Sequence, residues 1–218
     1  MGRTLCRIVA IPPNTSYKEA IKILKNCENH NIDGTGCVYV KDGKFVVQKY
    51  PKALSDVLDK KLPFLNHLPY DGWTIAHLRS ASLGEVKKHN THPFVSGNWA
   101  LAHNGTWTDS DIVRIALGKN AKVKGETDTE VALHLLKVAG PKRFTKYLSF
   151  GGVFAALHKN GNLWILKTSG TLWKYKNLLA SDLSFNEYKN QSTIDDGWYV
   201  YNKNGKLLDK HISNDNNQ

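Results

Sequence analysis

Short apolar runs that predict β-strands alternate along this chain with segments whose apolar residues recur at helical spacing. The strand-like runs are bounded by Gly, Asn, Asp and Pro, as strands in a sheet commonly are. The predicted strands cover residues 5–11, 37–40, 45–48, 73–77, 99–103, 153–158, 163–168, 197–201 and 206–210.

Four segments show helical signals. A helix is predicted to begin at residues 14–16 because Ala20, Ile23, Leu24 and Cys27 then repeat at helical spacing, which places Cys27 in the core. A second is predicted over residues 53–61. The remaining two are predicted over 112–117, with Thr108-x-x-Asp111 as its cap, and over 131–138, with a capping box at Thr127 and Glu130 and an end at Gly140-Pro141.

Three two-residue turns join neighbouring strands. Asp42-Gly43, Asn160-Gly161 and Asn204-Gly205 each lie between two strand-like runs, and these dipeptides favour hairpin turns. Hairpin-linked strands combined with several helices predict an α+β fold with antiparallel sheets. The pattern alone does not place the helices on particular sheet faces.

Composition narrows the class of protein. The 218 residues suit one domain with a full core. Neither a membrane-span-sized apolar run of about 18 residues nor a signal-peptide core is present, so no membrane association is expected. The formal net charge is +11, but the lysines are dispersed, so nucleic-acid binding is possible without being favoured. Three cysteines match neither a disulfide framework nor paired metal ligands, which indicates a reducing cytoplasm.

Four kinds of reactive or binding group follow one another at wide intervals. Cys6 offers a thiol, Arg79 a guanidinium, Asn104-Gly105 an amide beside a glycine, and Asp128 a carboxylate. Gathered together, these groups could hold an amino acid by both of its ends and attack its side-chain carbonyl. That chemistry is the removal of ammonia from glutamine.

The order and spacing of these groups resemble the class II glutamine amidotransferases, which are N-terminal-nucleophile (Ntn) hydrolases. The resemblance covers residues 6–210, which we take as the amidotransferase domain. It implies a four-layer αββα sandwich of two antiparallel sheets. The motifs that carry it are Cys6-Arg7-Ile8-Val9, His77-Leu78-Arg79, Asn90-Thr91-His92-Pro93-Phe94, His103-Asn104-Gly105, Asp128-Thr129-Glu130, Gly151-Gly152-Val153-Phe154-Ala155, Ala180-Ser181-Asp182 and Asp196-Gly197.

The resemblance also implies a role for each residue. Cys6 is the nucleophile, and the Asn104 side chain and the Gly105 N–H form the oxyanion hole. The substrate-binding residues are Arg79 for the α-carboxylate, Asp128 for the α-ammonium group, and His92 in a loop that shapes the pocket. The supporting residues are His77, His103 and Thr129. Neither a metal nor a cofactor is expected.

Each motif has a structural alternative. Cys6 alone reads as a buried strand cysteine, and Arg79 as a surface residue at a strand end. Asn104-Gly105 fits a hairpin turn, and Asp128 fits a helix cap. His89-x-x-His92 with His103 suggests a metal site only loosely, because neither a His-Glu-x-x-His motif nor paired cysteines accompany it.

The ends of the chain depart from the simplest family pattern. In the family the nucleophile's own α-amino group acts as the base, which requires Cys at position 1. In this chain residues 1–5 precede Cys6. They are interpreted as a possible propeptide or extension; alternatively, the start site is misassigned and Leu5 is the true initiation site. Residues 211–218 are predicted to form a polar tail.

Three functions remain open. The favoured one is a glutaminase-type amidotransferase domain that releases ammonia for a separate acceptor enzyme, because no G-x-x-x-x-G-K-S/T phosphate loop accompanies it. The second is hydrolysis of γ-glutamyl amides of small molecules at the same site. The third is an inactive relative that keeps residues 1–5 and acts as a binding module.

Overall fold

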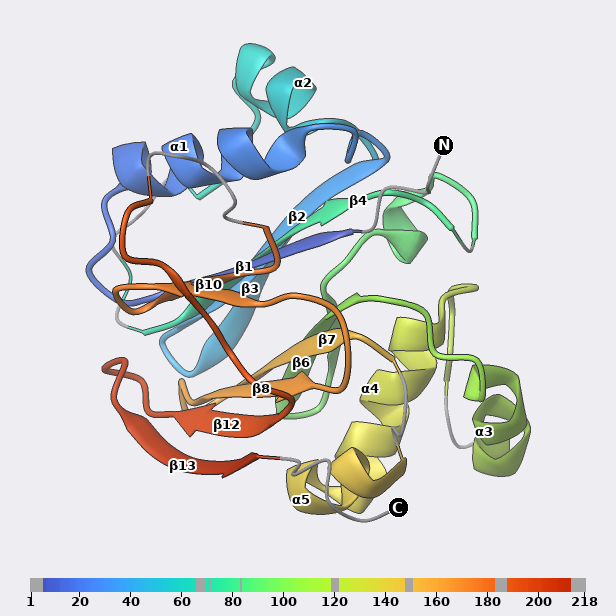
Figure 1. Cartoon of the computed structure of the whole chain (residues 1–218). Coiled ribbons are helices and arrows are strands. Elements are labelled where there is room, and N and C mark those ends of the chain that lie inside the picture. Colours follow the sequence, from blue (N-terminus) through green and yellow to red (C-terminus); the bar gives the residue numbers. More distant parts are fainter. Residues whose placement is uncertain are drawn as a thin grey trace.

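Two antiparallel sheets stack face to face, and helices cover both outer faces (Figure 1). The computed structural model describes residues 6–65, 70, 72–82, 84–118, 122–147, 151–182 and 188–212. Helices α1 (Tyr17–Glu28) and α2 (Leu54–Asp59) cover the first sheet. Helices α4 (Asp128–Ala139) and α5 (Pro141–Phe144) cover the second, with α3 (Ser110–Leu117) against α4. The predicted αββα sandwich is confirmed.

The first sheet places the strand that follows Cys6 near its centre. Its seven strands run in the order β11-β9-β10-β1-β4-β2-β3, and every recorded pairing is antiparallel. They are β1 (Arg7–Ile11), β2 (Gly34–Lys41), β3 (Lys44–Tyr50), β4 (Thr74–Arg79), β9 (Trp173–Tyr175), β10 (Leu178–Ala180) and β11 (Ser192–Thr193).

The second sheet carries the Asn104-Gly105 pair at one end of an inner strand. Its six strands run in the order β13-β12-β8-β7-β6-β5. They are β5 (Phe94–Ser96), β6 (Trp99–Asn104), β7 (Val153–His158), β8 (Leu163–Lys167), β12 (Gly197–Tyr201) and β13 (Leu207–Ile212). Short 3-10 turns, η1 (Lys88–Asn90) and η3 (Thr145–Tyr147), complete the described elements.

Three apolar clusters fill the three interfaces between the four layers. On β1 the alternation of side chains sends Val9 and Ile11 towards α1, and Ile8 and Ala10 towards the second sheet. The third cluster joins the outer face of the second sheet to α4. Cys27 is buried in the first cluster, as predicted.

The helix starts agree only partly with the predicted caps. The Ser16 hydroxyl accepts the Glu19 N–H at 3.2 Å and caps α1. The Thr127 hydroxyl accepts the Glu130 N–H at 3.4 Å, but the Glu130 carboxylate accepts N–H groups from Lys124 and Gly125 instead of completing a capping box. The predicted cap at Thr108 was wrong, because α3 begins at Ser110 after Asp109.

The chain ends and several short strands differ from the sequence prediction. Strands β5, β9, β10 and β11 were not predicted, and β10 matters because it pairs with β1 beside Cys6. Strand β13 continues to Ile212, so residues 211 and 212 belong to the sheet. The predictions for residues 1–5 and 213–218 lie outside the described residues. No helix in the described ranges is long and apolar enough to cross a membrane.

Candidate active site

Cys6 lies at the tip of the first sheet, immediately before β1. Because Arg7 pairs with Leu78, the antiparallel register brings Cys6 beside Arg79 at the end of β4. The Cys6 thiol donates a hydrogen bond to the Ser80 carbonyl, with Sγ and O 3.4 Å apart. The nucleophile candidate and the guanidinium candidate, 73 positions apart in sequence, are therefore neighbours.

The Cys6 thiol is held in its protonated form by its surroundings. Burial raises the pKa of Cys6 above its ordinary value of 9.0, while the bond to Ser80 and the charges of Arg79 and Arg7 oppose only part of that effect. A thiol of this kind is a poor nucleophile at neutral pH. Attack on an amide therefore requires a base that removes the thiol proton.

Arg79 is an interior residue with a defined set of partners. Only 2% of it is exposed, and its Nη1 and Nη2 atoms donate to the carbonyls of Glu85 and Gly84 at 3.0 and 2.9 Å. Burial lowers the pKa of Arg79, but its neighbours Cys6, Asp33 and Glu126 favour the charged form. These contacts fix the segment around residue 84 next to the tip of β1.

Asn104 and Gly105 end β6 on the opposite sheet. Gly105 has φ of 152°, and a Cβ atom there would lie 1.9 Å from the Gly151 carbonyl oxygen, so only glycine fits. Asn104 is 8% exposed, and its Oδ1 atom is buried without a hydrogen-bond partner among the described residues. The unpaired Oδ1 is an acceptor, whereas the oxyanion role expected from the sequence belongs to the Nδ2 donor of the same amide.

Three histidines and a threonine form a buried layer behind this pair. The His92 Nε2 atom lies 2.7 Å from Thr129 Oγ1, which lies 3.3 Å from His103 Nδ1. His77 Nε2 bonds to the His103 carbonyl at 3.0 Å, and the His77 and His92 rings stack with centroids 4.2 Å apart. Burial lowers the pKa of His77 to about 3 and that of His92 well below its usual range, so both rings are neutral.

Asp128 begins α4 and belongs to the same network. Its Oδ2 accepts the Trp107 N–H at 2.7 Å and lies 3.6 Å from His103 Nδ1, and its Oδ1 accepts the Thr129 hydroxyl at 3.1 Å. Burial alone would raise the pKa of Asp128, but these partners outweigh it and lower the pKa. Asp128 is therefore an ionised carboxylate at a helix N-terminus.

An ion pair that the sequence did not predict flanks Cys6 on its other side. The Arg7 Nε and Nη2 atoms each lie 3.0 Å from Asp182 Oδ2, and Nη1 donates to the Cys6 carbonyl at 3.3 Å. Ser181 also anchors β1, because its hydroxyl accepts the Ile8 N–H at 2.9 Å. Two features of the sequence could have indicated this ion pair: the Ala180-Ser181-Asp182 motif and the position of Arg7 directly after Cys6.

A cavity of about 660 Å³ opens next to the proposed oxyanion hole. Cys6, Arg79 and Asp128 are not among the residues that line it. The lining residues are Arg7, Asn104, Gly105, Thr106, Gly151, Gly152, Val153, Ser169, Gly170, Thr171, Trp173, Ser181 and Asp182.

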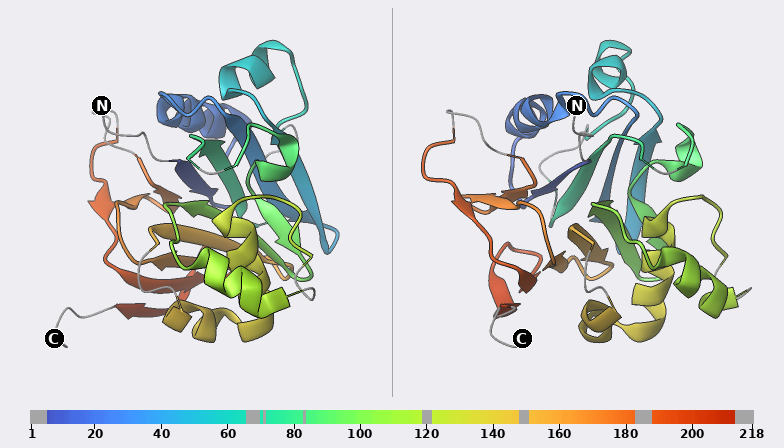
Figure 2. Two further views of the ribbon diagram at one scale, coloured as in Figure 1. Left: turned by 90° about the vertical axis from the view of Figure 1, so that its right-hand side faces the viewer. Right: turned by 45° about the vertical axis from the view of Figure 1, so that its right-hand side comes forward.

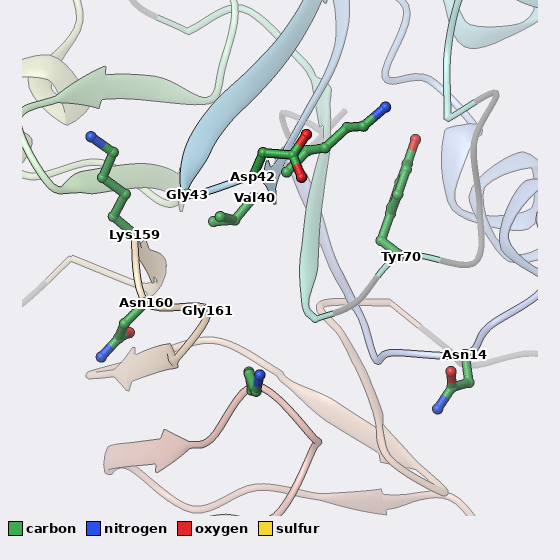
Figure 3. Close-up of a pocket in the computed structure, with 10 residues that line it drawn as sticks. Asn14, Val40, Asp42, Gly43, Tyr70, Lys159, Asn160 and Gly161 are labelled. Atoms are coloured by element: carbon green, nitrogen blue, oxygen red, sulfur yellow. The ribbon is translucent and has the colours of Figure 1, made fainter.

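A second cavity of about 700 Å³ lies at the other end of the strands. Figure 3 shows that its labelled residues come from several turns, among them Asp42-Gly43 and Asn160-Gly161. Asn14 follows the end of β1, and Tyr70 precedes β4. None of the predicted site residues lines it, so we place the candidate active site at the Cys6 end.

The structure thus brings the predicted residues to one end of the sandwich in two groups. Cys6 and Arg79 lie together at the tip of the first sheet, and Asn104, Gly105 and Asp128 lie with the histidine layer at the second. His92 lies within that buried layer, against Thr129. Within the described ranges, no group of three or more His, Cys, Asp or Glu side chains could hold a metal ion.

Comparison with known families shows which family the chain belongs to. The model of the class II glutamine amidotransferases matches residues 21–172. The chain belongs to this family of enzymes. The amidotransferase is 32% identical over 143 residues to glutamine–fructose-6-phosphate aminotransferase (isomerizing) of Wigglesworthia glossinidia brevipalpis, covering 61% of this chain and 22% of that protein. It is 31% identical over 209 residues to the Tropheryma whipplei (strain Twist) enzyme, covering 84% of this chain and 33% of that one.

Solved structures support the same fold. Glutamine phosphoribosylpyrophosphate amidotransferase from B. subtilis superposes with a TM-score of 0.73 at 17% identity, covering 95% of this chain and 49% of that one. A glutamine aminotransferase class-II domain protein from Silicibacter pomeroyi superposes with a TM-score of 0.64 at 14% identity, covering 95% and 99%. The chain spans about a fifth to a third of the length of the curated relatives it matches.

Proposed function

We propose that this amidotransferase domain hydrolyses the side-chain amide of glutamine through a thioester on Cys6 and releases ammonia for an acceptor substrate. The observation that carries this proposal is the junction of Cys6 and Arg79 at the tip of the first sheet, facing an end of the second sheet that carries Asn104 and Gly105. Fructose-6-phosphate and phosphoribosylpyrophosphate are acceptors named for the relatives, and neither is assigned to this chain.

The first chemical step depends on the N-terminus of the working enzyme. We infer that the active chain begins at Cys6, because its raised thiol pKa demands a base and a free α-amino group at the same residue can supply one. The amine takes the thiol proton, and Sγ attacks the carboxamide carbon. The leaving ammonia then receives the proton, which leaves a γ-glutamyl thioester.

The second step returns the enzyme to its starting state. Water attacks the thioester, the C–S bond breaks, and glutamate leaves while the thiol regains its proton. Both steps pass through an oxyanion that the Asn104 amide and the Gly105 N–H stabilise. Arg79 and Asp128 bind the α-carboxylate and α-ammonium groups of glutamine by charge.

The histidine layer holds these groups in position, and His92, expected to shape the substrate pocket, does so from behind Thr129. His92 orients Thr129, and Thr129 in turn contacts both Asp128 and His103, the residue before Asn104. His77 supports the His103 backbone from the first sheet. A thiolate nucleophile of this kind suits a reducing cytoplasm, where we expect the enzyme to work.

Ammonia release by a chain that begins at Cys6 tests this function. Wild type should convert glutamine to glutamate and ammonia, and Cys6→Ala should lose at least about 10⁴-fold in kcat because the nucleophile is gone. A diazoketone analogue of glutamine should label Cys6 and spare Cys27 and Cys37, where burial raises the pKa of each thiol to about 12. Cys37→Ala is the control and should keep activity. Labelling chiefly at Cys27 or Cys37 would refute the assignment.

A further inference from the structure

The cavity of about 700 Å³ at the end of the sandwich opposite the candidate active site is enclosed by turns from both sheets. The first sheet contributes the tip of its β2–β3 hairpin, residues 40–43. The second contributes the tip of the β7–β8 hairpin, residues 159–161, and Lys203 between β12 and β13. Figure 3 shows Lys159 on one side of the cavity and Tyr70 on the other. A ligand bound here would therefore contact both sheets.

Lysine side chains give the wall of this cavity a net positive charge. The lysines that line it are Lys41, Lys159 and Lys203. Asp42 is the one acidic residue among the described residues of the lining. Within the part of the chain that the structure describes, neither these lysines nor Asp42 form an ion pair or a side-chain hydrogen bond, whereas Lys87 and Lys167 each pair with a carboxylate. The cavity therefore presents cationic groups that are available to an anionic ligand.

The backbone that carries these lysines is fixed by contacts between the turns. A Cβ atom on Gly161 would lie 2.8 Å from the Lys203 Cβ, so glycine lets the β7–β8 turn lie directly against the β12–β13 turn. The buried Trp73 Nε1 donates to the Asn202 carbonyl at 2.8 Å, and Asn202 Oδ1 accepts the Asn204 N–H at 3.0 Å. The wall is preformed, which limits the entropy lost when a ligand binds.

We propose that this cavity is a binding site for a small organic phosphate, in which the lysines bind the phosphoryl group and the organic part fills the remaining space. A phosphoryl group carries about 1.5 to 2 negative charges at pH 7, so it matches the excess of cations in the wall. Lysine ammonium groups bind phosphate as point charges and need no bidentate geometry. The site is separate from the amidotransferase reaction and goes beyond the proposed function.

The rest of the wall favours a phosphate ester over inorganic phosphate. The volume of about 700 Å³ lies in the range of about 300–1,000 Å³ that is common for small-molecule sites. The amides of Asn14 and Asn160 can donate and accept hydrogen bonds from hydroxyl groups. Val40 and Tyr70 add apolar surface, and the Tyr70 ring is held in place by stacking on Tyr39 with centroids 3.7 Å apart. Sugar phosphates and nucleotides share this phosphate-ester chemistry.

A titration with three matched compounds tests the chemistry of the ligand. Ribose, ribose 5-phosphate and AMP are titrated into the full chain by calorimetry at pH 7.5 and low ionic strength. Both phosphates should bind saturably with a Kd below about 1 mM, at least about tenfold tighter than ribose, because hydrogen bonds to charged groups contribute more than those between neutral groups. Tighter binding of AMP indicates a nucleotide, and tighter binding of ribose 5-phosphate indicates a sugar phosphate.

Two results of the titration would overturn the inference. One is the absence of saturable binding for both phosphates up to about 10 mM, a concentration above the weakest useful affinities. The other is equal affinity for ribose and ribose 5-phosphate, because the lysines would then contribute nothing. High salt should weaken the binding of both phosphates, since the interaction is electrostatic.

Charge reversal at single lysines tests the location of the site. Lys41→Glu and Lys203→Glu should each weaken binding of the preferred phosphate at least about tenfold, because an anion then faces the phosphoryl group. Lys146→Glu makes the same change of net charge at an exposed residue of η3 that does not line the cavity, and its Kd should stay within about twofold of wild type. Thermal unfolding without ligand checks that each variant is folded.

The comparison among these variants decides the location. If all three weaken binding equally, the phosphate responds only to net charge and the inference is wrong. If neither Lys41→Glu nor Lys203→Glu weakens binding, the phosphate binds elsewhere and the inference is wrong. These titrations measure binding without glutamine, so the inference and the proposed function stand or fall separately.

Discussion

Two cavities of similar size open at opposite ends of the sandwich, at about 660 and 700 Å³, but their walls are built differently. The views in Figure 2 show the same stacked sheets from two further directions. In the cavity near Cys6, polar groups from different elements are tied together, as in the Arg7–Asp182 ion pair and the bond from the Ile8 N–H to the Ser181 hydroxyl. At the other end, the polar residues are mainly turn residues, including Lys159 and Lys203.

One dipeptide occurs at both ends and makes the comparison concrete. Asn160-Gly161 forms the exposed hairpin turn between β7 and β8, where Asn160 Oδ1 accepts the Asn162 N–H at 3.0 Å. Asn104-Gly105 ends β6, where Asn104 is buried and Gly105 nearly touches Gly151. The same two residues are a simple turn at one end and a candidate oxyanion hole at the other, because the surrounding structure differs.

Removal of the asparagine amide should change the rate of glutamine hydrolysis far more at the Cys6 end than at the opposite end. Asn104→Ala should lower kcat for glutamine hydrolysis by about 10²–10³-fold, because an oxyanion donor acts mainly in the transition state. Asn160→Ala is the matched control and should stay within twofold of wild type. Steady-state kinetics separates kcat from KM, and a change confined to KM for Asn104→Ala would contradict the oxyanion role.

Loss of the Arg79 guanidinium or of the Asp128 charge should have a smaller effect, chiefly on KM. Arg79→Lys and Asp128→Asn should each raise KM by about 10–100-fold, since a hydrogen bond to a charged group contributes about 1.5–3 kcal/mol. Lys159→Ala, in the opposite cavity, should leave KM unchanged. If either change lowers kcat while KM stays constant, that residue acts on the reacting carbonyl and not on the α-groups.

The buried histidines should make the fold sensitive to acid. His77 has a folded-state pKa of about 3, lower than its ordinary 6.5, so the unfolded chain binds more protons between these values. The contribution of neutral His77 to the stability of the fold should be fully present above pH 6.5 and should be lost as the pH falls towards 3. Thermal unfolding measured across this range should show the loss.

A matched pair of substitutions assigns that loss to the buried layer. His92→Gln should be less stable at pH 7.5 but should lose less further stability on acidification, because one neutral buried ring is gone. His211→Gln changes an exposed edge-strand residue and should follow wild type. If the stability of His92→Gln falls with pH as steeply as that of wild type, the histidine layer is not the cause of the acid sensitivity.

Much of the fold was predictable because it depends on local signals. The alternation of Ile8 with Val9, the Ser16 cap and the hairpin dipeptides each specify an element from a few neighbouring residues. The short strands β9 and β10 escaped prediction because each has only three residues, too few to show an alternating pattern. Strand β10 is held by pairing with β1, and β9 by pairing with β10. Helix α3 began at Ser110, two residues after the predicted cap at Thr108.

The sequence nominated the candidate site residues but not the partners that surround them. Motif order identified Cys6, Arg79 and Asn104, yet the contacts that define their environment join distant segments. The Arg7–Asp182 ion pair spans 175 positions, and the His92–Thr129 bond spans 37. The first contact arises when β10 pairs with β1, and the second when α4 packs beside β5, so a single sequence does not reveal them.

The central claim is that Cys6 acts as an N-terminal nucleophile, and a paired assay tests it most directly. Two preparations are verified by intact mass before and after the assay, one beginning at Cys6 and one retaining residues 1–5. The account predicts that only the first hydrolyses glutamine at a full rate, and that the second is slower by about 10²–10⁴-fold, because it lacks the basic α-amine. Full turnover by a chain that still carries residues 1–5 would contradict it.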